Sequence, residues 1–346
     1  MLGPLRSRLV SSDPDAAALA AGPRVTVNSP LTLRESLYSM AVLITGGLGV
    51  IGRRLTQHLR ERGYDVKVTD IAIRKEQDYR RADVTRYEEL AEIFRAWPIE
   101  HVFHLAGEVG RENGEQFPRR CVDINVSGTL NLIQLCSENG ARLYFASTSE
   151  VYGDHGTALV SEALETDSVL RPTNCYGLSK LQAEQYLRHF MENGPLQAAS
   201  MRFFMCYGPG ERPDPYRSAM TNFIDRLRHD QPITVHQGTA RSWCYIDDIV
   251  EGCRLLMENW DGKTYEGFNI GRADPRPMTE VAELLCRLLG RSTDLIELAS
   301  PGPFVTPIKN ASFDKARDRL AFEAVVDLEE GVRRTIAWHE ATFPIG

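Results

Sequence analysis

The sequence predicts an α/β fold built on a doubly wound parallel sheet, with helices on both faces. Two observations carry this prediction. Short apolar runs of strand type alternate along the chain with segments of helical periodicity. A glycine-rich turn, 46–52, lies between the first apolar run and the first helical segment. Strands that alternate with helices form a parallel sheet, because each crossover brings the chain back in the same direction.

The first strand and the turn after it have the features of a dinucleotide site. The run Ala41–Thr45 (AVLIT) is followed directly by GGLGVIG, and a helix then begins. Glycines permit a tight turn and let the backbone approach a pyrophosphate, while the helix N-terminus offers free N–H groups. This order of strand, glycines and helix predicts a Rossmann-type unit. The residues expected to contact the dinucleotide here are Gly46, Gly49, Val50 and Ile51.

The second expected strand, Val66–Asp70, ends in a carboxylate. An acidic residue about 20 positions after the glycines suits the adenosine ribose hydroxyls, and it repels the extra phosphate of NADP. Asp70 therefore favours NAD, although the nearby Ile73–Lys75 segment could serve a phosphate. The alternative is that Asp70 only caps a loop.

The alternation continues through the first half of the chain. We expect strands at His101–Leu105 and Arg142–Ser147, with a helix at Asn125–Cys136 between them. Ligands of such sheets bind at the carboxyl ends of the strands. The polar stretch Ser147–Glu150 stands at such an end, so we expect it in a site. A plain turn is the alternative.

Tyr176 and Lys180 lie four positions apart in a helical segment that begins at Asn174. This spacing places both side chains on one face of the helix. A nearby ammonium favours tyrosinate and lowers the tyrosine pKa from about 10. Such a tyrosine can remove a hydroxyl proton while hydride leaves the same carbon. The motif is weak alone, but behind the glycine turn and the polar strand end it predicts a catalytic pair.

Together these motifs resemble the extended short-chain dehydrogenase/reductase family, most of whose members use NAD to modify the sugar of a nucleotide-sugar. The resemblance covers about Met40 to the C-terminus. It rests on TGGLGVIG, Asp70, Asp83-Val84, HLAG at 104–107, Ser147–Gly153 and YGLSK.

The resemblance implies roles for several residues. Asp83 and Val84 would flank the adenine. Leu105 and Ala106 would lie on the nicotinamide side of the dinucleotide. Thr148 would contact the sugar 4-hydroxyl, beside the catalytic tyrosine.

The same resemblance divides the chain. Residues 40–203 would form mainly the NAD-binding domain, and 204–346 mainly a smaller α/β nucleotide-sugar-binding part with segments that return to the sheet. Met205 stands where family members usually have an Asn that contacts the sugar nucleotide. Gln237–Asp248 resembles the family stretch whose arginine meets the diphosphate, which implies that role for Arg241. A guanidinium suits phosphate oxygens bidentately. The alternative is an ordinary surface arginine.

The strand-end residues bear on the reaction. Family members first oxidise the sugar 4-hydroxyl. Dehydratases carry Thr-Asp-Glu here, but this chain has Ser149 in place of the Asp, and a serine is a poor general acid. The stretch resembles instead the TSEVYG of UDP-glucuronate decarboxylases, in which the 4-keto sugar is a β-keto acid that loses CO2. Glu150 would then face the substrate carboxylate and favour its loss by repulsion.

Two departures from the decarboxylase pattern leave the carboxylate contact open. The loop Gly107–Glu115 replaces a PASPxxY-type loop, and Thr306–Asn310 replaces an RRKP-type segment. Arg111 or Lys309 would take over that contact, or both are solvated charges. The leading prediction is a UDP-glucuronate decarboxylase, with or without re-reduction to UDP-xylose. A 4-epimerase or 4-ketoreductase is the runner-up, and a non-catalytic NAD-binding sensor is the alternative of another class.

Composition sets the outer bounds. The 346 residues are 42% hydrophobic with a net charge of −7, which disfavours nucleic-acid binding. No apolar run reaches the roughly 18 residues of a membrane span. Seven widely spaced cysteines and eight histidines show no disulfide framework and no metal-ligand spacing, so we expect a cytoplasmic protein without a metal.

Residues 1–39 read as a loosely ordered extension, with Met40 as a plausible internal start. By family likeness, helices at about 117–138 and 176–193 would form a homodimer.

Overall fold

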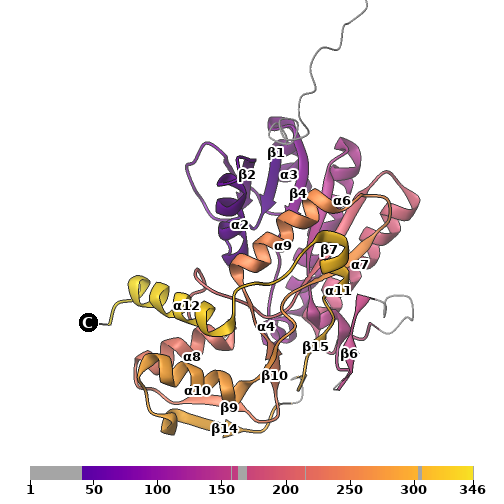
Figure 1. Ribbon diagram of the computed structural model, residues 1–346. Helices are drawn as coiled ribbons and strands as arrows, with labels where there is room; N and C mark the ends of the chain where they lie inside the picture. Colours follow the sequence, from indigo (N-terminus) through magenta and orange to yellow (C-terminus); the bar gives the residue numbers. More distant parts are fainter. Residues whose placement is uncertain (1–40, 157, 163–169, 215, 303–305, 346) are drawn as a thin grey trace, which may run out of the picture.

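The computed structural model describes residues 41–156, 158–162, 170–214, 216–302 and 306–345 (Figure 1). The expected extension and Met40 lie outside these residues. A central sheet runs in the order β12-β7-β5-β4-β1-β2-β3, and every neighbouring pair is parallel. Its strands are β1 (Ala41–Thr45), β2 (Asp65–Asp70), β3 (Tyr79–Arg81), β4 (Ile99–His104), β5 (Arg142–Thr148), β7 (Gln197–Phe203) and β12 (Glu266–Ile270). The predicted fold class is confirmed.

Helices cover both faces of this sheet, as Figure 1 shows. One face packs against α2 (Val50–Arg60), α9 (Ile246–Asn259) and α11 (Asp314–Leu320). The other packs against α3 (Tyr87–Ala96), α6 (Gly128–Asn139) and α7 (Cys175–Asn193). Because both faces are buried, β1 is apolar at successive positions: Val42 and Ile44 join the first core, and Ala41 and Leu43 the second. No sequence pattern pointed to β3 or α3.

The helix expected at Asn125–Cys136 is present, but it begins earlier and changes its winding. A short α5 (Pro118–Arg120) runs into a π-helical segment, η1 (Cys121–Ser127), which continues as α6 without a break in helical backbone. Asn125 lies in the π segment and is fully buried. Its Nδ2 donates to Ser179 Oγ (2.9 Å) on α7. Single π turns of this kind are frequent at functional sites.

The second half of the chain adds a smaller α/β layer below the carboxyl edge of the sheet (Figure 1). It has its own apolar core, formed by α8 (Ala219–Arg228), β9 (Ile233–His236), α10 (Met278–Leu289), β14 (Ile296–Ala299) and α12 (Leu328–Thr342). β9 and β14 pair in parallel. The return segments expected from this half are α9, β12 and α11, which pack on or join the central sheet.

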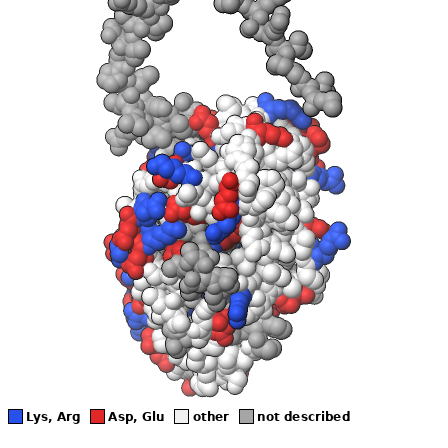
Figure 2. All heavy atoms as spheres, turned by 90° about the vertical axis from the view of Figure 1, so that its right-hand side faces the viewer, with Lys and Arg blue, Asp and Glu red and all other residues white. Residues whose placement is uncertain are grey.

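Three short strand pairs position the edge of the site. They are β6 (Leu159–Val160) with β15 (Asn310–Ala311), β8 (Cys206–Tyr207) with β11 (Cys244–Tyr245), and β10 (Ala240–Ser242) with β13 (Pro275–Pro277). Because β15 pairs with β6, the adjacent Lys309 is brought close to the end of β5. On the face drawn in Figure 2, basic and acidic side chains are interspersed rather than gathered by sign. Across the described ranges, each helix is too short or too polar to span a bilayer.

Candidate active site

A cleft of about 860 Å³ lies at the carboxyl edge of the central sheet. Its walls are the ends of β1, β2, β4 and β5, the start of α7, and loops of the second half. Every residue predicted to contact the dinucleotide lines it: Gly46, Gly49, Val50, Ile51, Asp70, Asp83, Val84, Leu105, Ala106, Tyr176 and Lys180. Thr148 lines the same cleft. The sequence therefore identified one continuous surface.

The glycine turn forms a cradle in which side chains have no room. Gly46 has φ +66°, and a Cβ there would lie 2.6 Å from the Ala106 backbone nitrogen. A Cβ on Gly52 would lie 2.3 Å from the Gly46 carbonyl oxygen. Gly49 is the N-cap of α2, whose first turn carries no acidic residue. Free amides at a helix N-terminus behind a glycine turn fit the pyrophosphate of a dinucleotide.

Asp70 holds the adjacent loop, which is one of the two roles that the sequence left as alternatives. Its Oδ2 accepts a hydrogen bond from the Leu48 backbone nitrogen (3.0 Å), so the carboxylate fixes the glycine turn. The same residue lines the cleft. Asp83, further along that wall, accepts from both the backbone nitrogen and the hydroxyl of Thr85 at 2.9 and 2.8 Å. Their contacts with ribose and adenine remain predictions.

Tyr176 and Thr148 meet across the cleft. Helix α7 approaches the end of β5 closely, because a Cβ on Gly177 would lie 2.8 Å from the Glu150 carbonyl oxygen. Tyr176 makes a side-chain hydrogen bond with Thr148. Burial raises the pKa of Tyr176, and this bond only partly offsets it. The lowered tyrosine pKa expected from the sequence is therefore wrong for this structure, because burial disfavours the charged phenolate.

Lys180 is buried one turn further along the same helix. Its Nζ lies 4.7 Å from the centre of the Phe145 ring. The Gly107 backbone approaches it closely, since a Cβ on Gly107 would lie 2.9 Å from that Nζ. Burial lowers the pKa of Lys180 to about 8. A lysine with such a pKa holds its proton loosely near neutral pH, which suits a proton-transfer site.

The remaining predicted residues lie close together beyond Thr148. We call the three cations Arg111, Arg241 and Lys309, together with Glu150, the basic cluster. Lys309 Nζ donates to the Glu150 carboxylate and to Ser149 Oγ, the latter at 3.2 Å. Arg111 and Arg241 are close enough to act electrostatically on Lys309. These residues come from α4 (Arg111–Gln116), β10, the end of β5 and the segment before β15. The cluster holds three cations and one carboxylate.

Burial makes this arrangement unusual. Arg241 and Lys309 are each only 6% exposed, so the solvated-charge interpretation is wrong for both. Burial lowers the pKa of Arg241 to about 10, and the neighbouring Arg111 adds to that effect. Burial alone would raise the pKa of Glu150, but Lys309 and Arg111 hold it below its ordinary value. Glu150 is therefore an ionised carboxylate surrounded by cations.

The structure differs from the sequence-based expectation for Glu150. Its two oxygens are already engaged, one by Lys309 and the other by Asn174 Nδ2 at 2.9 Å. A carboxylate held in this way is not free to repel a substrate carboxylate. Glu150, Ser149 and the three cations lie beside the large cleft rather than on its wall. Ser149 and Lys309 instead border a cavity of about 10 Å³.

Several further residues line the cleft. From the first half come Glu108, Asn113 and Arg120, and from the second come Glu211, Asp214, Tyr216 and Arg217. Glu108 pairs with Arg120 Nη2 at 2.7 Å. The segment Gly210–Arg217, charged and directly after YGPG, was the one signal that could have indicated the second group.

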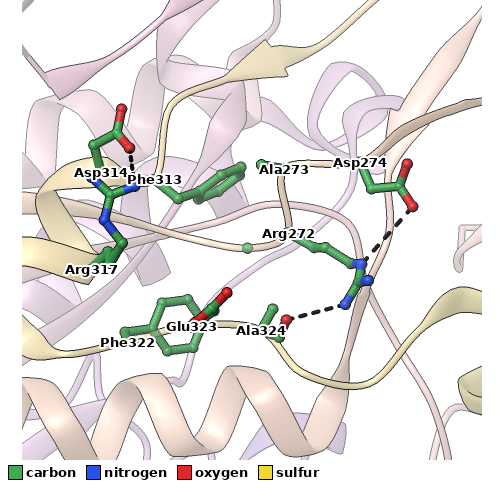
Figure 3. A pocket seen from close by; sticks show the side chains of 10 residues that line it. Arg272, Ala273, Asp274, Phe313, Asp314, Arg317, Phe322, Glu323 and Ala324 are labelled. Atoms are coloured by element: carbon green, nitrogen blue, oxygen red, sulfur yellow. Dashed lines mark hydrogen bonds and ion pairs between the residues drawn. The ribbon is translucent and has the colours of Figure 1, made fainter.

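A second pocket, of about 380 Å³, lies past the end of β12 (Figure 3). Four of its charged side chains, Arg272, Asp274, Asp314 and Arg317, are engaged with one another or with backbone. Arg317 Nη1 pairs with Asp314 at 2.6 Å, and Arg272 Nη1 donates to the Ala324 carbonyl oxygen at 3.1 Å. The larger cleft, with its titratable groups of shifted pKa, is the better candidate.

A glycine cradle, an acidic strand end and a Tyr–Lys pair facing a threonine are typical of dinucleotide-dependent dehydrogenases of the short-chain class. The comparison with known families agrees. The model of the NAD dependent epimerase/dehydratase family matches residues 42–271, and the chain belongs to this family. The resemblance seen in the sequence and the expected cofactor, NAD, are thereby confirmed.

Individual relatives resemble the chain along most of its length. A UDP-glucuronate 4-epimerase from Thermodesulfobacterium geofontis is 30% identical, over 88% of this chain and 97% of the relative. UDP-glucuronic acid decarboxylase 6 from Arabidopsis thaliana is 29% identical, over 88% and 90%. The solved structure of MoeE5 in complex with UDP-glucuronic acid and NAD is 28% identical with a TM-score of 0.76, over 88% and 100%.

Proposed function

We propose that the protein is a UDP-glucuronate 4-epimerase, which inverts C4 of the sugar through a 4-keto intermediate and keeps the C6 carboxylate. Decarboxylation of the same substrate, the leading expectation from the sequence, is the second candidate. The observation that carries the proposal is the pair of buried cations in the basic cluster, Arg241 and Lys309.

The buried cations support an acidic sugar. Arg241 and Lys309 are both buried, Lys309 pairs with the one carboxylate of the cluster, Glu150, and a bound anion would lower the cost of keeping both cations charged. A UDP-uronate brings a diphosphate and a carboxylate, and so supplies this negative charge. Arg241 is the proposed diphosphate contact, and Arg111 and Lys309 are the proposed carboxylate contacts. A sugar whose 4-hydroxyl meets Thr148 and Tyr176 would point its C5 substituent toward this cluster, because Glu150 follows Thr148 by two residues.

The same charges favour retention of the carboxylate. In decarboxylation the C5–carboxylate bond breaks, its electron pair becomes a C4–C5 enolate, and neutral CO2 leaves. Cations paired with the carboxylate stabilise it more before this step than during it, so they slow the loss. The group expected to promote the loss, Glu150, is neutralised by Lys309. The names of the relatives also favour epimerisation, because several UDP-glucuronate 4-epimerases of Arabidopsis thaliana resemble the chain, in addition to the bacterial one.

We assign the proton at O4 to Tyr176. Its phenolate oxygen would take the proton from the 4-hydroxyl on oxidation, and the phenol so formed would return that proton to O4 on reduction, with Thr148 holding both oxygens in line. Because burial raises the pKa of this tyrosine, it needs a cation nearby when it loses its proton. Lys180, on the same helical face, is proposed to provide this positive charge. A Tyr176→Phe variant with undiminished turnover would contradict this assignment.

The cleft residues fit NAD, which when bound takes up hydride from C4 and gives it back. We propose that the turn residues Gly46, Gly49, Val50 and Ile51 hold the pyrophosphate. Asp70 would accept from the ribose hydroxyls, and Asp83 with Val84 would flank the adenine. Leu105 and Ala106 would lie against the nicotinamide side.

The reaction is tested by product analysis with UDP-glucuronate and NAD. An epimerase gives a product of unchanged mass that separates from the substrate and has the proton couplings of UDP-galacturonate. A mass lower by about 44 units, that of CO2, would show decarboxylation instead. UDP-glucose provides the control substrate, because it lacks only the carboxylate.

Arg111→Ala tests the carboxylate contact. We expect KM for UDP-glucuronate to rise at least tenfold, about the effect of one lost charge-assisted contact, while KM for UDP-glucose changes less than threefold. Equal effects on the two substrates would contradict the contact.

We also propose a homodimer through η1, α6 and α7. Exposed apolar side chains on these helices support it, namely Val122, Leu178, Tyr186 and Phe190. Sedimentation equilibrium of the protein and of Leu178→Glu would test it; the variant should be the weaker dimer. A cytoplasmic location stays a prediction.

A further inference from the structure

We propose that Asn174 is a positioning residue that ties the carboxylate-binding end of the site to the first turn of the catalytic helix. This inference rests on the proposed function, because it concerns a substrate that fills both ends. Asn174 is 5% exposed and is the N-cap of α7. No motif in the sequence assigned it a role beyond the start of that helix.

Both polar atoms of the Asn174 side-chain amide make hydrogen bonds. Its Oδ1 accepts a hydrogen bond from the Gly177 backbone nitrogen at 2.8 Å. Its Nδ2 donates to Glu150 Oε2 at 2.9 Å. The two partners fix the orientation of the amide, since a backbone N–H can only donate and an ionised carboxylate can only accept. The low pKa of Glu150 agrees with its being ionised.

Asn174 thereby closes a ring of contacts around the reacting end of the cleft. Glu150 is held by Lys309 on its other oxygen. The backbone nitrogen of Glu150 donates to Thr148 Oγ1 at 3.2 Å, and Thr148 bonds with Tyr176. Tyr176 lies in the first turn of α7, which Asn174 caps. The ring therefore fixes the separation between the ammonium proposed to hold the carboxylate and the hydroxyl proposed to move the O4 proton.

A cap alone does not explain the choice of asparagine. Serine, aspartate and asparagine are about equally good N-caps. Serine has no group that could reach Glu150 as a donor, and aspartate would oppose one carboxylate with another. Only asparagine caps the helix and donates to Glu150 at once. The identity of this residue is explained by the link rather than by the helix start.

The consequence concerns turnover more than binding. Without the link, the first turn of α7 can shift relative to the end of β5. A substrate held at both ends then meets a displaced tyrosine, and misplacement by about 1 Å costs on the order of 100-fold in rate. UDP-glucose lacks the carboxylate proposed to contact Arg111 and Lys309, so its sugar is held less firmly at that end and can follow the helix, and its turnover falls less.

Asn174→Ser separates the two roles, because it keeps the cap and removes the donor. We expect kcat for UDP-glucuronate to fall at least tenfold, with KM within threefold of the parent protein and the Tm nearly unchanged. The kcat for UDP-glucose should fall less than threefold. Asn174→Ala, which loses the cap as well, should also lower the Tm. An unchanged kcat for UDP-glucuronate in Asn174→Ser would overturn the proposal.

A donor–acceptor exchange provides the decisive control. Asn174→Asp should lower the Tm by at least about 3 °C through carboxylate repulsion. Glu150→Gln, which leaves Lys309 without its carboxylate, should lower the Tm less in Asn174→Asp than in the parent protein, because the glutamine amide can donate to the new carboxylate. Effects on the Tm that merely add would overturn the link. This cycle needs no substrate. If the parent protein does not turn over UDP-glucuronate, the proposed function is wrong. The Tm values of these variants still test the contact between Asn174 and Glu150.

Discussion

Two groups of buried polar side chains lie at neighbouring strand ends of one sheet, and they are built in opposite ways. At the ends of β1 and β4, the His104 ring bonds with Thr45 Oγ1 (2.8 Å) and Thr129 Oγ1 (3.1 Å). Burial lowers the pKa of His104 to about 3, so this group is neutral. At the end of β5, Glu150 and Lys309 are buried as ions with two arginines beside them.

This difference indicates which group has a structural role and which has a ligand-binding role. The neutral group satisfies itself, because each ring nitrogen of His104 has a hydroxyl partner. A second buried group, Arg202 with Glu184 at 2.5 Å, is charged but balanced. The basic cluster differs from both, because two buried cations, Arg241 and Lys309, lie near a single carboxylate, Glu150. Buried cations beside a cleft are favoured when a bound anion completes the site.

The largest effect is expected where the cofactor side depends on backbone alone. Gly52→Ala places a methyl 2.3 Å from the Gly46 carbonyl oxygen, and neither partner is a flexible side chain. We expect NAD affinity to fall at least about 100-fold, a loss of about 3 kcal/mol, since overpacking against rigid backbone costs this much or more. Isothermal titration with NAD measures it.

Gly302→Ala is the matched control, because nothing lies within 4 Å of a Cβ at that position. NAD binding by Gly52→Ala that equals that of the control would contradict the tight cradle.

A smaller but more telling effect is expected in the basic cluster. Lys309→Met leaves Glu150 buried with one fewer cation, and unfolding free energy should fall by about 3 kcal/mol. The variant should also release some CO2 from UDP-glucuronate, because a cation that restrains the substrate carboxylate is gone. Urea unfolding and trapping of radiolabelled CO2 measure the two effects.

The double variant Lys309→Met with Glu150→Gln serves as the control for stability. It should recover most of the lost unfolding free energy, since no buried charge is left behind, while the CO2 release persists. A double variant as unstable as Lys309→Met would show that the ion pair is not the cause.

The smallest effect concerns pH and the neutral group. The folded-state pKa of His104 is lowered from 6.5 to about 3, so between these values only the unfolded chain takes up the proton. Stability should therefore fall as pH drops below 6.5, by up to about 1.4 kcal/mol per unit from this residue. Above that pH, His104 contributes no dependence. Urea titrations between pH 7 and pH 4.5 measure the slope.

His104→Gln should reduce that slope, because glutamine keeps a donor and an acceptor but does not titrate. His101, whose pKa burial lowers to about 4, remains in the variant and preserves part of the slope. An unchanged slope would mean that other groups dominate acid unfolding.

The cofactor side could be predicted from the sequence because neighbours in the chain determine it. The glycine cradle needs only a strand, a turn and a helix in succession. Asp70 follows one strand later, and the Tyr176–Lys180 spacing is fixed within a single helix. In each case the decisive contacts lie within a short segment, so the local pattern carries them.

The residues of the basic cluster could be predicted from the sequence, but their proximity to one another could not. Arg111, Arg241 and Lys309 were each candidates, yet nothing local shows that they converge with Glu150. Their convergence depends on α4 and on the pairing of β15 with β6, which are long-range events. For that reason the sequence suggested that Glu150 faces the substrate carboxylate, whereas the structure pairs it with Lys309 and Asn174.

The π segment Cys121–Ser127 acts as a change of phase along one helix. An α-helix turns by about 100° per residue, so one extra residue in a turn rotates everything before it relative to everything after it. Ile124 can thus line the cleft, while Leu132 and Cys136 on the continuation of the same helix point into the core. Removing one residue from the segment would keep the helix straight but turn Asn125 away from Ser179, and the cofactor wall would lose its tie to α7.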